Sequence, residues 1–172
     1  MEADRTKLVP MGESQLTHVD TAGAARMVDV SAKDVTVRSA TATGVLRTTA
    51  EVVELLRRDG LPKGDALATA RIAGIMGAKR TPDLVPLCHP IALHGVKVDL
   101  ELGDDTVAIT ATVRTADRTG VEMEALTAVA VAGLTLIDMV KAVDPAVSVD
   151  AVRCEAKDGG KTGSWRRPEE RS

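Results

Sequence analysis

Aromatic residues are nearly absent from this sequence of 172 residues, which contains no phenylalanine, no tyrosine and one tryptophan, Trp165. Proteins that bind single-stranded nucleic acid stack the bases on aromatic side chains, so the sequence argues against that class. The formal net charge of −3 also argues against a broad basic surface for nucleic acid. Because aromatics are missing, the core must be built from aliphatic residues and methionine, and the hydrophobic content of 44% is ordinary for a globular protein.

Cysteine is also scarce: Cys88 and Cys154 are too few for a disulfide framework. The first 15 residues contain no apolar stretch of the signal-peptide kind. No apolar run approaches the length that would span a bilayer. These absences together predict a protein without a membrane segment, in a reducing and cytoplasmic setting.

The length indicates one domain, which we place at residues 16–159 between mobile tails at 1–15 and 160–172. We expect Thr48 to cap the first helix, with Glu51 completing a capping box. A hairpin between helices, followed by a helix and a strand, is typical of a ferredoxin-like α+β two-layer sandwich, an antiparallel sheet with helices packed on one face. Strand patterns occur at 25–33, 36–46, 91–102, 106–115 and 148–156, and helical patterns at 49–59, 65–79 and 120–144.

The longest helical pattern, residues 120–144, is apolar through its middle and charged only near its ends. An apolar helix interior belongs in a core or against a partner. Gly133 weakens such a helix by about 1 kcal/mol relative to alanine, so we expect a tight contact there. The charged positions are Glu122 and Glu124 at the start, and Asp138 and Lys141 near the end.

Asp138 and Lys141 are three residues apart and therefore share a helix face. On a solvated helix such a pair is a surface ion pair worth about 0.2–0.5 kcal/mol. In a partly buried cleft, a lysine beside an aspartate can instead act as acid and base. The spacing alone leaves both interpretations open.

The loop around Cys88 and His89 is made rigid by Pro82, Pro86 and Pro90, and such a loop can present a titratable histidine to a ligand. Its ordinary interpretation is a structural histidine beside a small buried thiol. A zinc site would need His94, Cys154 or distant carboxylates as further ligands. Because the close-spaced ligand pairs of such sites are missing, we expect no metal.

The glycine-rich segment 158–163 is superficially similar to a phosphate-binding loop. It lacks the earlier glycine of the Walker A pattern, since Glu155 occupies that position, and no helix follows it. Lys157 and Lys161 can still contact a phosphate from a turn of this kind. If the chain brings its turn and loop cations together, they would form a polyphosphate pocket; these are Arg38, Lys63, Lys79, Arg80, Lys141 and Lys157.

Several motifs occur in an order that resembles the molybdenum cofactor biosynthesis protein C family, the cyclic pyranopterin monophosphate synthases. The resemblance extends from about Leu16 to Gly163, and its specificity comes from the number of motifs. They are Leu16-Thr17-His18, Met27–Lys33 (MVDVSAK), Lys63-Gly64-Asp65, Leu87–Pro90 (LCHP), Gly120–Thr127 (GVEMEALT), Asp138-Met139 with Lys141-Ala142, and Gly159-Gly160-Lys161.

The resemblance implies a ferredoxin-like fold and a homohexamer, arranged as a trimer of dimers, with active sites at subunit interfaces. It implies a lyase that acts on (8S)-3′,8-cyclo-7,8-dihydroguanosine 5′-triphosphate. The product is cyclic pyranopterin monophosphate, an intermediate on the route to molybdopterin, and pyrophosphate is released. No redox cofactor is implied.

The resemblance also assigns roles to single residues. Asp138 and Lys141 fall on the family's central acid–base pair, and Val140 stands where a cysteine is expected. Asp117-Arg118 is a second departure from the family pattern, and neither departure removes a group assigned to the chemistry. The residues that match the substrate-binding pocket are Arg38, Lys63, Leu87, Cys88, His89, Glu122, Met123, Glu124 and Lys157.

Two other functions stay open. A ferredoxin-like fold can bind small molecules without chemistry, as a ligand-sensing module that binds nucleotide and releases no pyrophosphate. A metal-dependent hydrolase would instead use Cys88, His89 and His94.

Overall fold

The computed structural model describes residues 23–58, 61 and 65–168. It contains both helices and strands, and two of the helices are long. In order they are β1 (Thr36–Arg47), α1 (Ala50–Arg57), α2 (Ala66–Lys79), α3 (Thr81–Leu84), β2 (Gly95–Leu102), β3 (Thr106–Asp117), α4 (Glu122–Val140), β4 (Ser148–Asp158) and β5 (Trp165–Arg166).

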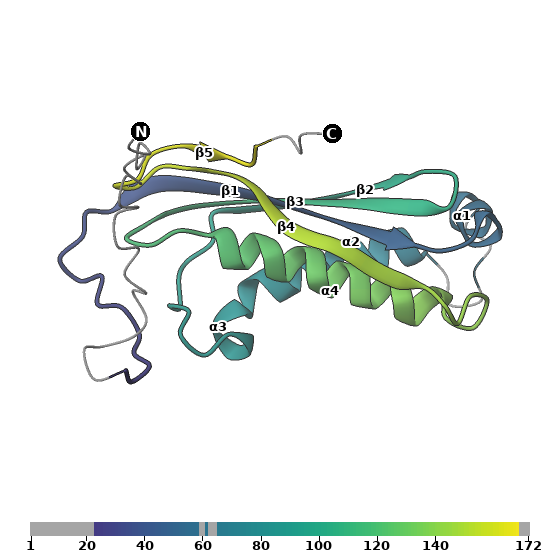
Figure 1. Ribbon diagram of the computed structural model, residues 1–172, viewed down its shortest axis with the longest axis horizontal. Coiled ribbons are helices and arrows are strands. Elements are labelled where there is room, and N and C mark those ends of the chain that lie inside the picture. The colour runs from purple at the N-terminus through teal and green to yellow at the C-terminus, as the bar shows by residue number, and fades with distance from the viewer. Residues whose placement is uncertain (1–22, 59–60, 62–64, 169–172) are drawn as a thin grey trace, which may run out of the picture.

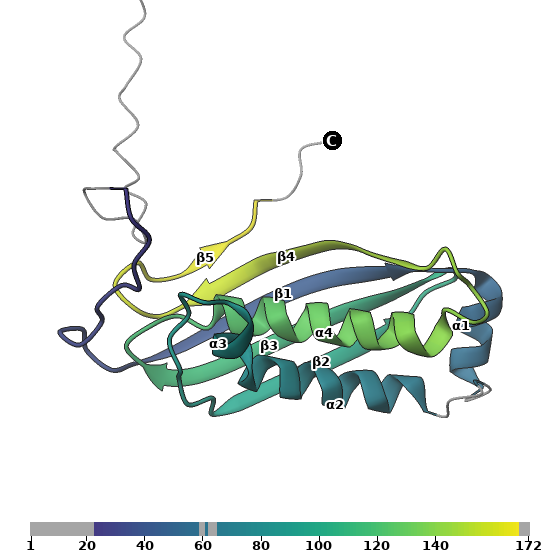
Figure 2. The same cartoon turned by 90° about the horizontal axis from the view of Figure 1, so that it is seen from below.

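The strands form one sheet in the order β2-β3-β1-β4-β5, and every neighbouring pair is antiparallel. The β2–β3 hairpin and the long helices α2 and α4 give the β-α-β-β-α-β arrangement of a ferredoxin-like fold. Both long helices lie on the same face of the sheet (Figures 1 and 2). The predicted α+β two-layer sandwich is therefore confirmed.

The core consists of small aliphatic side chains between α4 and the sheet. A Cβ atom added to Gly133 would lie 2.8 Å from Cγ2 of Val149, so the tight contact expected at this glycine is present, against β4. Although α4 is apolar enough to span a bilayer by length and composition alone, 56% of its apolar window is buried within this protein. Packing of α4 along the sheet shows that it serves here as a core helix.

Three local predictions differ from the structure. Residues 25–33 form an irregular segment with an isolated bridge at Ala25, and no strand of the described sheet forms a ladder with it. The cap of α1 is Thr49, whose hydroxyl accepts from the amide of Val52, whereas Thr48 donates to Asp144. Within the C-terminal segment, β5 pairs with the end of β4, which the sequence analysis did not anticipate.

The chain turns sharply after β4 at Gly159 and Gly160, whose φ angles are +91° and +72°. A Cβ atom at Gly159 would collide with the carbonyl oxygen of Val37, and one at Gly160 would collide with the guanidinium of Arg38. The turn therefore requires glycine for two reasons, the backbone conformation and the close approach of β1.

Replacement of Gly159 by alanine tests this close approach against a matched glycine. Gly163 also has a positive φ, of 65°, but nothing lies within 4 Å of an added Cβ. We expect Gly163→Ala to lower the free energy of unfolding by about 1 kcal/mol through backbone strain alone, and Gly159→Ala by about 3 kcal/mol because of the added collision. Urea unfolding at one fixed protein concentration measures both; equal losses would contradict the close approach.

Candidate active site

A cleft lies at the end of the molecule where α4 begins. The loop after α3 and the irregular segment before β1 meet the first turn of α4 there (Figure 2). The part lined by the first turn of α4, which we call the inner hollow, has a volume of about 400 Å³. Its lining brings together two motifs that are distant in sequence; these are Leu87, Cys88 and His89 from the loop, and Glu122, Met123 and Glu124 from α4.

Two further hollows continue from the inner one toward the glycine turn. The middle hollow, of about 170 Å³, shares Lys33 and Glu122 with the inner hollow and adds Arg38 and Lys157. The outer hollow, of about 670 Å³, shares Lys33 and Arg38 with the middle one and adds Lys161. The cleft is therefore acidic and partly apolar at its inner end and cationic at its outer end.

Glu124 is the buried acid of the inner hollow, with only 3% of its surface exposed. Burial raises the pKa of this carboxyl to about 7, and the neighbouring carboxylate of Glu122 adds to the rise. A group with such a pKa can hold or release a proton near neutral pH. Burial also raises the pKa of the Cys88 thiol, which favours a neutral packing residue over a nucleophile.

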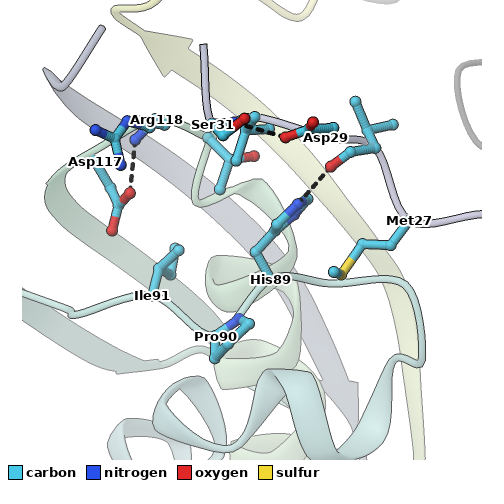
Figure 3. Close-up of a pocket in the computed structure, with 11 residues that line it drawn as sticks. Met27, Asp29, Ser31, His89, Pro90, Ile91, Asp117 and Arg118 are labelled. Atoms are coloured by element: carbon cyan, nitrogen blue, oxygen red, sulfur yellow. Dashed lines mark hydrogen bonds between the residues drawn. The ribbon is translucent and has the colours of Figure 1, made fainter. Parts of the chain in front are cut away.

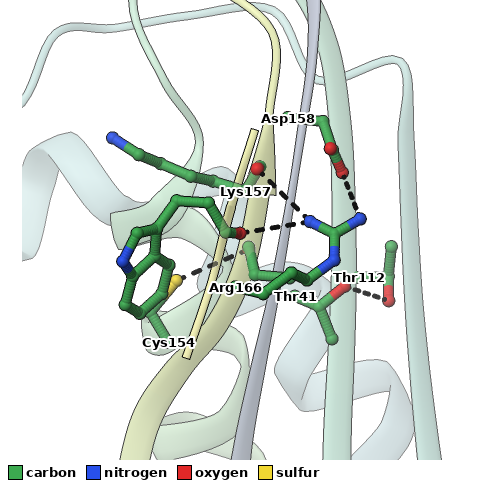
Figure 4. A network of polar contacts seen from close by, with 8 residues as sticks. Thr41, Thr112, Cys154, Lys157, Asp158 and Arg166 are labelled. Atoms are coloured by element: carbon green, nitrogen blue, oxygen red, sulfur yellow. Dashed lines mark hydrogen bonds and ion pairs between the residues drawn. The ribbon is translucent and has the colours of Figure 1, made fainter. Parts of the chain in front are cut away.

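Glu122 and Lys157 join the inner and middle hollows. Lys157 Nζ lies 3.2 Å from Glu122 Oε1, and both side chains are about one-third exposed. The end of β4 that carries Lys157 is braced by β5, since Arg166 binds the Asp158 carboxylate at 3.1 Å and donates to the carbonyl oxygen of Lys157 (Figure 4). The side chain of Lys157 points away from Arg166 and is available to the cleft.

Arg38 is held beside the glycine turn. Its Nε donates to the carbonyl oxygen of Asp117 at 3.0 Å, which fixes the guanidinium between β1 and β3. Because Gly160 has no side chain, the guanidinium lies directly over the turn. Arg38 consequently lines both the middle and the outer hollow.

His89 contacts the irregular segment that precedes β1. Its Nε2 donates to the carbonyl oxygen of Val28 at 2.7 Å (Figure 3). On the far side of this segment lies a front hollow of about 470 Å³, which includes His89, Asp117 and Arg118 in its lining. His89 thus lines two hollows, one on each side of the segment.

Asp138 and Lys141 lie near the other end of α4. Lys141 Nζ donates to Asp138 Oδ1 at 2.6 Å, and the two side chains are 58% and 57% exposed. Asp138 follows Glu122 by 16 positions in the sequence, which is about 24 Å along a helix. Within one chain, the predicted acid–base pair is therefore not brought to the cleft that holds the other predicted residues, and Lys63 lies outside the described residues.

The part of the chain that the structure describes contains no group of three His, Cys, Asp or Glu side chains placed to hold a metal ion. His94, the third ligand of the hydrolase alternative, instead accepts from the amide of Ala116 at 3.3 Å through its Nδ1. Cys88, His89 and His94 thus do not converge, and the hydrolase alternative loses its ligand set.

Sequence reasoning did not single out Lys33, Thr119 or Gly120, although all three line both the inner and the middle hollow. Each belongs to or borders a motif quoted above, MVDVSAK or GVEMEALT, so motif membership was the available signal. It did not show which members face the cleft, because that depends on how segments distant in sequence pack.

The sequence profile described as the MoaC family matches residues 27–160 of this chain. A cyclic pyranopterin monophosphate synthase of Streptomyces coelicolor is 68% identical over 155 residues, which cover 90% of this chain and 91% of that protein. One of Streptomyces avermitilis is 67% identical over 158 residues, or 92% and 93% of the two chains. The cyclic pyranopterin monophosphate synthase 2 of Mycobacterium tuberculosis (strain H37Rv) is 61% identical over 153 residues, or 89% and 92%. The profile match includes the inner hollow and both ends of α4, and the chain belongs to the MoaC family.

Proposed function

We propose that this chain is a cytoplasmic phosphorus–oxygen lyase of molybdenum cofactor biosynthesis that needs no resident cofactor. Its substrate would be (8S)-3′,8-cyclo-7,8-dihydroguanosine 5′-triphosphate, and its products cyclic pyranopterin monophosphate and pyrophosphate. The observation that carries this proposal is the two-ended cleft of a MoaC-family chain. A buried carboxyl lies at its inner end and cations lie at its outer end.

The charges of the cleft match the two ends of such a substrate. Arg38 and Lys157 would bind phosphate oxygens, and a guanidinium can do so with two parallel hydrogen bonds. His89, Glu122 and Glu124 would hold the purine-derived ring in the inner hollow, where Leu87, Cys88 and Met123 supply apolar surface. Lys63 stays a predicted phosphate ligand.

The reaction needs proton transfers and charge stabilisation. A hydroxyl oxygen of the substrate attacks the α-phosphorus, the bond from that phosphorus to the bridging oxygen breaks, and pyrophosphate leaves. Opening of the purine-derived ring and closure of the pyran also move protons. Lys141, which is ion-paired with Asp138, would serve as general acid and base, and the cations would stabilise charge on the phosphates.

Asp138 lies about 24 Å along α4 from Glu122, which lines the cleft. Asp138 and Lys141 can therefore act in this cleft only if a second copy of the chain supplies them. We infer that the site lies at a subunit interface of a homohexamer, a trimer of dimers, in which the partner supplies this pair. Exposed apolar side chains support burial by another copy: Ile72 and Met76 on α2 are 59% and 54% exposed, and Leu134 on α4 is 64% exposed.

The first test is the release of pyrophosphate from the cyclic dihydroguanosine triphosphate by the parent and by Lys141→Ala. We expect release by the parent and a loss of at least about 100-fold in the variant, because it lacks the general acid and base. Lys97→Ala, which removes another exposed and ion-paired lysine, from the edge strand β2, should keep parent activity. Nucleotide binding without release by the parent would instead favour the ligand-sensing module.

Complementation tests which chain supplies which residue. Glu122→Gln and Lys141→Ala each inactivate every site when present alone. Co-expressed in equal amounts, the two variants pair at random, so about half of the dimers contain one copy of each. In such a mixed dimer one of the two sites receives both intact residues, so about one quarter of parent activity should return. If both residues acted from the same chain, no mixed site would be intact and no activity would return.

The raised pKa of Glu124 makes stability depend on pH in a defined direction. The folded state binds this proton more tightly than a carboxyl at the ordinary value of 4.5, so its contribution is complete below pH 4.5 and is lost as pH rises through about 7. Relative to Glu124→Gln, the parent should therefore lose about 2 kcal/mol of unfolding free energy between pH 4.5 and 8, after allowance for solvent screening.

Urea unfolding at several pH values measures this difference, and Glu101→Gln controls for the loss of an exposed carboxylate on β2. A difference between the parent and Glu124→Gln that did not change with pH would show that folding does not raise the pKa of Glu124.

A further inference from the structure

Residues 26–34 form an irregular segment across the cleft, which we call the strap. It separates the front hollow from the inner hollow, and Val28 and Val30 line both. Only these two residues of the strap are half-buried, and the rest are exposed. Figure 3 shows the strap passing over His89.

Two side chains from outside the strap bind its backbone. His89 Nε2 donates to the carbonyl oxygen of Val28 at 2.7 Å, and Arg118 Nε donates to the carbonyl oxygen of Lys33 at 2.9 Å. Two further hydrogen bonds are internal to the strap, from the amide of Ser31 to the Asp29 carboxylate and from the amide of Lys33 to the carbonyl oxygen of Val30. A segment with few buried contacts and few ties opens at low cost in free energy.

Lys33 occupies a special position on the strap, because it lines the inner, middle and outer hollows together. The other cations of the middle hollow, Arg38 and Lys157, belong to strands and are held by Asp117 and Glu122. Because these partners lie outside the strap, the positions of Arg38 and Lys157 do not depend on whether the strap is open or closed. The charge of Lys33, in contrast, reaches the cleft only while the strap is down.

We propose that the strap lifts to admit the substrate and closes over it, and that Lys33 makes closure depend on the bound phosphates. The identity of the ligand, a polyphosphate ester, rests on the proposed function. A ligand shifts an equilibrium between open and closed states only if it interacts differently with the two. The phosphate contact of Lys33 exists in the closed state alone and supplies this difference.

The two positions on the strap therefore have separable roles. Arg118 holds the strap with or without ligand, so its removal raises the rate of opening in both conditions. Lys33 responds to the ligand, so its removal leaves the empty protein unchanged and abolishes the effect of the ligand on the strap.

Hydrogen exchange of peptides covering residues 27–34 tests both roles, with inorganic tripolyphosphate as the probe. In the parent, we expect tripolyphosphate to slow exchange by about fivefold or more, the lower end of ordinary coupling between a ligand and a conformational change. Lys33→Gln should lose this slowing, and Arg118→Ala should exchange faster without the probe. Lys97→Gln, on the opposite edge of the sheet, should behave as the parent.

Equal slowing in the parent and Lys33→Gln would overturn the proposal, as would absence of slowing in the parent, whether or not calorimetry shows that tripolyphosphate binds. The pyrophosphate-release assay separates this result from the proposed function. Turnover by a parent whose strap does not respond refutes the strap proposal alone. A responsive strap without turnover refutes the proposed reaction and leaves the strap proposal standing.

Discussion

Burial of α4 against the sheet is the constraint on which the other features depend. Its small side chains allow the helix to approach β4 so closely that Gly133 has no room for a Cβ atom. This fixed position carries the first turn of the helix into the cleft, with Glu124 buried and Glu122 paired to Lys157. An ionised carboxylate is costly at the position of Glu124, and a rigid core of this kind can hold it there because packing elsewhere outweighs that cost.

The same sheet places the cations. Arg38 lies near the start of β1 and Lys157 near the end of β4, and these positions are close together because the two strands are antiparallel neighbours. The turn at Gly159 and Gly160 has no side chains, so the space beside Arg38 stays open. The cationic outer end of the cleft therefore follows from strand register and from one turn, whereas the protonatable inner end also needs the loop after α3 and the irregular segment before β1.

Hydrophobic periodicity was sufficient to predict the sandwich, and the family resemblance implied a pocket that includes His89, Glu122 and Glu124, which line one hollow. The sequence was insufficient where two residues or two conformations are equally suitable locally and tertiary packing decides between them. Thr48 and Thr49 have the same capping chemistry, and only the position of Asp144 directs Thr48 elsewhere. Residues 25–33 alternate as a strand does, yet no strand of the described sheet forms a ladder with them. The separation of Asp138 from Glu122 follows from the predicted helix, but the position of the cleft at the start of α4 depends on how the loop after α3 and the segment before β1 pack there (Figure 2).

The scarcity of aromatic residues has a practical consequence. The intrinsic fluorescence of this protein comes from Trp165 alone, which is 39% exposed on β5, pairs in register with Lys157 and lies beneath the guanidinium of Arg167 at 5.8 Å. Its emission reports on the strand edge behind the middle hollow and carries little information about the aliphatic core. The chain therefore contains a built-in optical probe for that wall of the cleft, whereas melting of α2 and α4 must be followed by circular dichroism.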